Sequence, residues 1–294
     1  MNSKKSVLII GAGEIGQAIG HVLRKSAVHP KLMLWDSDSR KGTARVPLAT
    51  LVPSADFVFL CVPSLVLRQV CHEIADEVQN SAVVIALTKG IEPDGHLVDQ
   101  ILEEELRNAV SGVLGGPLLA EELLANLGGV GSFGSTNAKA RYSVHKLFAR
   151  TGIRLEFFEE PRSVALLGVL KNVYSVAIAM ASSVMPGDNA RGYFTAMAMK
   201  EMTIMLGKYG CEPVHVLSAA GAGDLIATSQ SRHSFNAKVG RELAKGKRAN
   251  SSEGTRAVPV IAKFLGSEMH QLPLFTALKL VIGGKTVKSV SQNL

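Results

Sequence analysis

Cysteine is scarce in this chain, which has three among its 294 residues. Cys61, Cys71 and Cys211 form neither a Cys-x-x-Cys pair nor the spacing of a metal-ligand set, so we expect no bound metal. Cys61 lies in an apolar run and is expected to be a small buried hydrophobic residue. An odd number of cysteines without a spacing pattern fits a reducing compartment, and we expect a cytoplasmic location.

Aromatic residues are also few, at 5% of the sequence, and charged residues make up 19%. The hydrophobic content of 47% therefore rests mainly on aliphatic residues, which with 28 glycines is typical of a globular α/β protein. The basic residues behind the net charge of +7 are scattered along the sequence. They either form an ordinary solvated surface or give a mild attraction for anionic ligands. Because no basic helix face with interleaved aromatic residues occurs, we expect no nucleic-acid partner.

The chain has no recognisable secretory signal and no uninterrupted membrane-spanning run. Residues 1–5 are polar, and a strand pattern follows them at once. The longest apolar stretch, residues 164–185, is long enough to cross a bilayer. It contains Lys171 and Asn172, and a charge inside a spanning helix is costly in lipid. We therefore expect a buried helix and no membrane span.

The pattern of the chain changes near residue 160. Before it, short β-branched runs alternate with helical patterns, which indicates a parallel sheet with crossover helices. The expected strands are 6–10, 31–35, 56–62, 81–87, 111–116, 130–133 and 154–158, with helices at 15–25, 64–78, 94–106 and 137–151. After Pro161 only helical patterns remain, at 163–185, 189–209, 236–245, 256–265 and 273–282. We predict an α/β protein with a Rossmann-type parallel-sheet domain (1–160) and an all-helical substrate-binding domain (161–294).

A glycine-rich motif follows the first predicted strand. Gly11, Gly13 and Gly16 form Gly-x-Gly-x-x-Gly, with Glu14 and Ile15 inside it, between a strand and a helix. The first glycine makes a tight turn, the second lets the backbone approach a pyrophosphate, and the third packs helix against strand. The helix N-terminus faces the negative charge. We expect a dinucleotide here; the alternative is a Rossmann-like domain that binds none.

The end of the second strand bears on the choice of dinucleotide. Asp36 lies 20 residues after Gly16, where a carboxylate bonds the ribose hydroxyls and repels a 2′-phosphate. This favours NAD as the cofactor. The residues that follow would suit the 2′-phosphate of NADP instead, so NADP is the alternative: Ser37, Ser39, Arg40 and Lys41.

Three charged side chains are candidates for catalysis or substrate binding. Lys171 interrupts an apolar helix, and a lysine in such a place either exchanges a proton with a substrate or extends its ammonium to solvent. Lys89 follows a strand at the sheet edge where α/β proteins bind ligands, although it could be an ordinary loop lysine. Asp224 ends a glycine-rich segment predicted as a flexible turn; it either orients a catalytic ammonium or caps the next helix.

A series of short motifs runs along most of the chain. In order they are Gly11–Gly16, Leu34-Trp35, Val62-Pro63-Ser64, Thr88-Lys89-Gly90-Ile91, Gly116-Pro117, Ala120-Glu121-Glu122, Leu170–Val173, Gly187–Arg191, Gly221–Leu225, Ser234, Asn236 and Glu253-Gly254. Each fragment is weak by itself. As an ordered set they resemble the NAD(P)-dependent glycerol-3-phosphate dehydrogenase family.

The resemblance implies hydride transfer between the nicotinamide and C2 of glycerol 3-phosphate or dihydroxyacetone phosphate. Lys171 would donate and accept the proton, Lys89 would help to bind the substrate, and Asp224 would support both. Lys89 is also assigned to the catalytic set. Further cofactor contacts are implied for Trp35, Lys89, Ala120 and Glu253, and further substrate contacts for Gly116, Asn172, Ser234, Phe235 and Asn236. The family also implies a homodimer.

Three features depart from the family pattern. Phe235 replaces an arginine that should meet the substrate phosphate, and phenylalanine offers no donor. Leu118 replaces a small hydroxyl residue, and residues 37–55 form a shorter connection than the family has. Three interpretations stay open. Arg191, Arg232 or Lys238 replaces the lost charge, or the enzyme reduces a different and less anionic 2-keto substrate, or the chain is a non-catalytic dinucleotide-binding relative.

Overall fold

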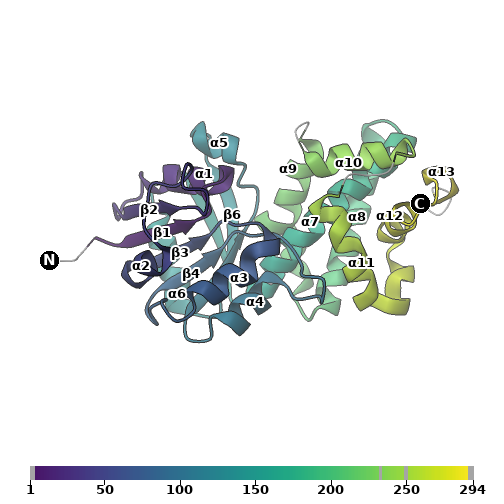
Figure 1. The fold of residues 1–294 in the computed structure, drawn as a ribbon. Coiled ribbons are helices and arrows are strands. Elements are labelled where there is room, and N and C mark those ends of the chain that lie inside the picture. The colour runs from purple at the N-terminus through teal and green to yellow at the C-terminus, as the bar shows by residue number, and fades with distance from the viewer. Residues whose placement is uncertain (1–3, 232–233, 248–250, 291–294) are drawn as a thin grey trace. The chain divides into compact units, whose positions relative to one another are not determined.

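The computed structural model describes residues 4–231, 234–247 and 251–290, which form two compact units (Figure 1). The first unit comprises Met1–Lys89 and His96–Ala165, and the second comprises Gly90–Gly95 and Leu166–Leu294. The sequence pattern predicts a domain boundary near residue 160, and the chain passes from the first unit to the second after Ala165, inside the helix Pro161–Val184. Nothing in the sequence pattern indicated that residues 90–95 associate with the second unit.

The first unit is built on a seven-stranded sheet. Its strands are β1 (Ser6–Ile10), β2 (Lys31–Trp35), β3 (Phe57–Leu60), β4 (Val83–Ala86), β5 (Val110–Gly115), β6 (Gly129–Gly134) and β7 (Ile153–Phe158). The order across the sheet is β2-β1-β3-β4-β5-β6-β7, and every neighbouring pair is parallel except β5 and β6. β2 and β3 pair with opposite sides of β1, so the strand order reverses at this point. The carboxyl ends of β1 and β3 therefore mark the place where such sheets bind ligands.

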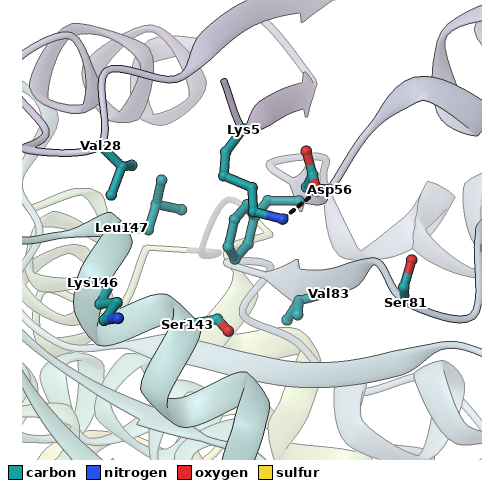
Figure 2. A pocket seen from close by; sticks show the side chains of 9 residues that line it. Lys5, Val28, Asp56, Ser81, Val83, Ser143, Lys146 and Leu147 are labelled. Carbon is teal, nitrogen blue, oxygen red and sulfur yellow. Dashed lines mark hydrogen bonds and ion pairs between the residues drawn. The ribbon is translucent and has the colours of Figure 1, made fainter. Parts of the chain in front are cut away.

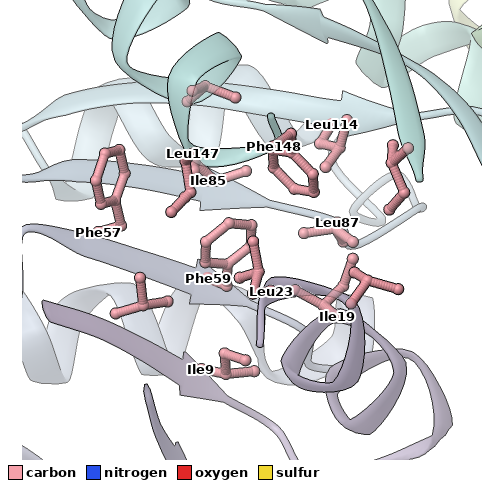
Figure 3. Packing of buried hydrophobic residues seen from close by; sticks show 14 of the residues in the cluster. Ile9, Ile19, Leu23, Phe57, Phe59, Ile85, Leu87, Leu114, Leu147 and Phe148 are labelled. Atoms are coloured by element: carbon pink, nitrogen blue, oxygen red, sulfur yellow. The ribbon is translucent and has the colours of Figure 1, made fainter. Parts of the chain in front are cut away.

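Helices lie against both faces of this sheet. They are α1 (Glu14–Leu23), α2 (Leu48–Leu51) with the short 3₁₀ turn η1 (Val52–Ser54), α3 (Ser64–Ile74), α4 (Val98–Glu105), α5 (Ala120–Leu124) and α6 (Ala138–Leu147). Ile9 and Phe59 pack with side chains of α1 and α6 on one face (Figure 3). Their neighbours Leu8 and Ile10 point to the other face and are also fully buried. Burial on both faces explains why the strands are apolar without alternation.

The second unit is helical. It contains most of α7 (Pro161–Val184), followed by α8 (Asp188–Lys208), η2 (Pro213–Leu217), the π-helix η3 (Ala219–Gly223), α9 (Asp224–Gln230), α10 (Phe235–Ala244), α11 (Glu253–Leu265), η4 (Gly266–Gln271), α12 (Pro273–Ile282) and α13 (Val287–Val290). Glycines allow close packing on α7: a Cβ at Gly240 of α10 would lie 2.2 Å from the carbonyl oxygen of Val176. Of the helices in the described residues, α7 alone has the length and composition of a membrane span, yet 89% of its most apolar window is buried inside the protein.

The predicted α/β class with a Rossmann-like first part and a helical second part is confirmed. Cys61 is buried as expected, and burial raises the pKa of its thiol to about 12. The flexible turn predicted to precede Asp224 was wrong. Residues 219–223 form a π-helix, and Asp224 is the first residue of α9, with Ser218 accepting a hydrogen bond from the Gly221 N–H at 3.2 Å.

Candidate active site

The glycine-rich loop of the first unit has the shape that the motif requires. Gly11 has a φ of +99°, and its N–H donates to the Trp35 carbonyl at 2.8 Å. A Cβ at Gly16 would lie 1.9 Å from the Gly11 carbonyl oxygen, so only glycine lets α1 pack here. A Cβ at Gly13 would meet nothing within 4 Å. The open space over the start of α1 fits a phosphate group at a helix N-terminus.

Asp36 joins this loop to the end of β2. Its Oδ2 accepts a hydrogen bond from the Ala12 N–H at 2.7 Å, and its Oδ1 accepts one from the Asp38 N–H at 2.9 Å. Arg40, a candidate for a 2′-phosphate, is exposed and forms an ion pair with Asp38 at 2.9 Å. The carboxylate of Asp36 thus lies beside the backbone that would hold the pyrophosphate, and the nearby guanidinium already has an anionic partner.

Other predicted residues follow β2, β4 and β5 at the same edge. Lys89 Nζ donates to the Gly116 carbonyl at 3.2 Å, which ties the loops after β4 and β5 together. Leu118 packs against the core of the sheet domain and is partly buried. The apolar side chain at this position therefore contributes to packing. Trp35 ends β2, Glu14 is exposed in the first turn of α1, and Ala120 begins α5.

A separate pocket of about 140 Å³ lies at the opposite edge of the sheet (Figure 2). Its lining includes Lys5, Asp56 and Ser81, which come just before β1, β3 and β4. Lys5 Nζ lies 2.7 Å from Asp56 Oδ1. None of the predicted site residues lines this pocket, and ligands of open α/β sheets bind at the carboxyl ends of the strands instead.

The second unit brings Lys171 and Asp224 together. Lys171 Nζ lies 3.6 Å from Asp224 Oδ1, and these side chains are 11% and 2% exposed. Thr228 lies one turn after Asp224 on α9; its Oγ1 accepts from Lys171 Nζ at 3.3 Å and donates to Asp224 Oδ1 at 3.1 Å. The sequence indicated the lysine and the aspartate, but Thr228 had no signal because isolated threonines are common on helices.

The local sequence explains how the aspartate reaches the lysine. A Cβ at Gly221 would lie 2.2 Å from the Val216 carbonyl oxygen, so the chain folds tightly only with glycine there. The widened π-helix leads directly into α9, and such π segments are frequent at functional sites. Asp224 is thereby held in the first turn of α9, where the helix dipole favours a carboxylate.

A second polar network surrounds Asn172, the residue after Lys171. Asn172 Nδ2 donates to Glu253 Oε2 at 2.8 Å, and Asn236 Nδ2 donates to Asn172 Oδ1 at 2.9 Å. Gly254 joins this network by donating its N–H to Asn236 Oδ1 at 3.4 Å, and it packs closely on α7, since a Cβ there would lie 2.4 Å from the Asn172 carbonyl oxygen. The structure therefore gathers predicted residues from α7, α10 and α11 that are up to 81 positions apart.

Phe235, which replaces the arginine of the family pattern, lies at the start of α10. Ser234 caps this helix by accepting from the Ala237 N–H at 3.2 Å. Phe235 follows it and is 51% exposed. Lys238, one of the suggested replacements for the missing arginine, is exposed on α10, and Arg191 forms an ion pair with Asp188. Arg232, the third candidate, lies outside the described residues.

Two family profiles match the chain. The profile described as the N-terminus of NAD-dependent glycerol-3-phosphate dehydrogenase matches residues 41–140, and the one described as its C-terminus matches residues 160–292. Among curated relatives, the glycerol-3-phosphate dehydrogenase [NAD(P)+] of Alcanivorax borkumensis is 30% identical, over 99% of this chain and 94% of its own length. That of Teredinibacter turnerae is 29% identical with the same coverage.

Solved structures have the same fold. The glycerol-3-phosphate dehydrogenase of Coxiella burnetii superposes with a TM-score of 0.86 at 21% identity, covering 98% of both chains. The enzyme of Saccharomyces cerevisiae superposes with a TM-score of 0.85 at 20% identity, covering 99% of both. These likenesses extend over both units and establish the architecture.

Proposed function

Because the chain belongs to the NAD-dependent glycerol-3-phosphate dehydrogenase family, we propose that it interconverts glycerol 3-phosphate and dihydroxyacetone phosphate. It is an oxidoreductase acting on a CH–OH group with NAD or NADP as cofactor, as the sequence predicted. The buried Lys171–Asp224 pair is the observation that carries the proposed mechanism. No finding favours a different substrate or a non-catalytic relative.

The residues of the first unit fit a dinucleotide, which supplies the hydride when bound. The open backbone at Gly13 and the start of α1 would hold the pyrophosphate. Asp36 would accept hydrogen bonds from the adenosine ribose, since a carboxylate oxygen that binds Ala12 retains a further lone pair. We propose NAD as the preferred cofactor, because a 2′-phosphate would meet the Asp36 carboxylate while Arg40 is engaged with Asp38.

Lys171 is proposed as the general acid and base. In the reducing direction its ammonium would donate a proton to the substrate oxygen as C2 receives the hydride, and in the oxidising direction its amine would accept that proton. Asp224 and Thr228 orient Nζ from one side. Such proton transfer contributes about 10²- to 10⁴-fold to a rate. A lysine extended to solvent would not have an 11% exposed side chain beside a buried carboxylate.

The start of α10 is proposed to hold the phosphate end of the substrate. The first N–H groups of a helix have no intrahelical acceptor, and here those of Phe235 and Asn236 lie in that position. Asn236 places this end beside Asn172 through its side-chain hydrogen bond. These backbone donors would then bind the phosphate in the absence of the family arginine. Lys89 is proposed as a substrate-binding residue on the family resemblance alone.

A direct assay tests the proposed function. Purified protein is given dihydroxyacetone phosphate or dihydroxyacetone, each with NADH and with NADPH, and loss of reduced-nicotinamide absorbance is followed. Turnover of the phosphate ester alone supports the proposal. Intact cofactor binding without turnover of the phosphate ester contradicts it. We further propose that the protein acts in the cytoplasm as a homodimer, and light scattering on the purified chain tests the dimer.

A further inference from the structure

A buried carboxylate in the second unit has no part in the proposed mechanism. Glu201 lies on α8 and is 1% exposed, in a chain where most acidic residues face water. A carboxylate in such a place is costly unless hydrogen bonds compensate for its lost hydration. Glu201 has three donors: the N–H groups of Leu274 at 2.6 Å and Phe275 at 2.9 Å, and the hydroxyl of Tyr174 at 2.9 Å.

Two of these donors begin α12. Pro273 is the first residue of that helix and has no N–H, so the first two donors of the helix belong to Leu274 and Phe275. The preceding residue, Leu272, has no polar side chain to cap the helix. Glu201 therefore caps α12 from another helix. Its negative charge also faces the positive end of the helix dipole.

The third donor connects this cap to α7. Tyr174 is completely buried, and it lies three residues after Lys171 and two after Asn172. Residues three apart on a helix share a face, so the hydrogen bond to Glu201 restrains the turn of α7 that carries Lys171. Glu201 thus joins α7, α8 and α12 at one carboxylate.

The angle of α7 about its own axis matters for catalysis. Because side-chain tips lie roughly 5–6 Å from a helix axis, a rotation of about 10° moves them by about 1 Å. A displacement of about 1 Å at a reacting group is enough to reduce a rate about a hundredfold. A buried hydrogen bond that resists this rotation would therefore influence turnover without touching the substrate.

We propose that Glu201 is a positioning residue, which holds Lys171 beside Asp224 by fixing α7 through the Tyr174 hydroxyl. This inference rests on the proposed role of Lys171. It assigns a function to an acidic residue that contacts neither the cofactor loop nor the Lys171 cluster.

The experiment uses Tyr174→Phe, since truncating Glu201 itself could prevent folding by uncapping α12. Tyr174→Phe removes the hydroxyl bond to Glu201, together with the weaker contact to Met205 Sδ at 3.8 Å, and leaves both α12 bonds to Glu201 intact. Thr203→Val is the control, because it removes a hydroxyl hydrogen bond made within α8, from Thr203 to the Met199 carbonyl at 2.9 Å. For each protein we would measure kcat, the KM for each substrate, the melting temperature and the ¹⁵N signal of the Lys171 ammonium.

We expect kcat of Tyr174→Phe to fall about tenfold or more with the KM for NADH unchanged, while Thr203→Val retains the wild-type kcat at a similar melting temperature. Wild-type kcat in Tyr174→Phe would overturn the inference. If the wild-type protein shows no turnover, the proposed function has failed. The ¹⁵N signal of the Lys171 ammonium then tests the positioning inference by itself. A signal changed in Tyr174→Phe but not in Thr203→Val supports positioning, and an unchanged signal refutes it.

Discussion

Asn236 donates a hydrogen bond to Asn172 at 2.9 Å, although 64 positions separate them in the chain. Asn172 adjoins Lys171, and Asn236 adjoins Phe235 at the start of α10. The proposed proton-transfer group and the proposed phosphate-binding end of the substrate site are thus connected by a single hydrogen bond. Substitutions on the two sides should have separable effects, one on the chemical step and the other on substrate affinity.

Replacing Lys171 by alanine tests the chemical step. We expect kcat to fall by about 10²- to 10⁴-fold, because the substrate oxygen loses its proton donor. The affinity for NADH, measured by fluorescence titration, should stay the same. Lys208→Ala is the control, since it removes an ion-paired lysine on the surface of α8. Substantial turnover by Lys171→Ala would refute the assigned role.

Asp36→Asn tests the choice of cofactor. The amide oxygen still accepts the Ala12 N–H, but the negative charge that opposes a 2′-phosphate is gone. We expect kcat/KM for NADPH to rise about tenfold relative to that for NADH, which corresponds to about 1.4 kcal/mol. Asp76→Asn, an exposed position after α3, should leave the ratio unchanged. An unchanged ratio in Asp36→Asn would remove the basis for NAD preference.

Phe235→Arg tests how the phosphate is bound. A guanidinium adds charge-assisted donors at the start of α10, and hydrogen bonds to charged groups contribute about 1.5–3 kcal/mol. We expect the KM for dihydroxyacetone phosphate to fall at least about tenfold, with no change for unphosphorylated dihydroxyacetone. Phe264→Arg is the matched control, because Phe264 on α11 is similarly exposed, at 57% against 51%. Equal effects from both substitutions would contradict phosphate binding at α10.

Glu201 should make stability depend on pH. Burial raises the pKa of its carboxyl from the ordinary 4.5 to about 6, while the Phe275 and Leu274 N–H groups and the Tyr174 hydroxyl oppose that rise. The folded state therefore binds more protons between these values. The stability contributed by this shift is fully present below pH 4.5 and is lost as the pH rises through about 6. Tyr174 does not titrate in this range, since burial raises its pKa well above the ordinary value.

The measurement compares urea unfolding of the wild-type protein with that of Glu201→Gln. The side-chain amide of this variant does not ionise between about pH 4 and about pH 8. The free energy of unfolding of the wild type, relative to the variant, should fall by about 2 kcal/mol as the pH rises from about 4 to about 8. If the difference in free energy of unfolding between the two proteins stays constant across this range, the pKa of Glu201 is not raised in the folded state.

The fold followed from local patterns, because strand and helix periodicities are properties of short segments. Lys171 was conspicuous for the same reason, as a charge inside an apolar helix pattern. Thr228 and Glu201 were not predictable in this way. Thr228 is significant only because α9 places it beside Lys171 and Asp224, and the donors of Glu201 on α12 lie 73 and 74 positions away. Their roles arise from tertiary packing, which composition and spacing do not encode.

Leu118 is an instructive exception. Its apolar character at an expected polar position suggested an altered substrate pocket, but its side chain packs on the sheet core beside Gly129. The short connection 37–55 contains α2 and η1, which the sequence did not predict, and Leu48 and Val52 in it are buried. Departures from a family pattern can therefore reflect altered packing as well as altered chemistry.

Gly254 has a consequence for attempts to change what this protein accepts. With the Asn172 carbonyl 2.4 Å from where a Cβ would stand, no larger residue is tolerated without displacing α11 from α7. Random libraries that include this codon would mostly yield misfolded clones. The exposed Phe235 is free of that restriction, so the first turn of α10 can accept new side chains without disturbing the packing on α7.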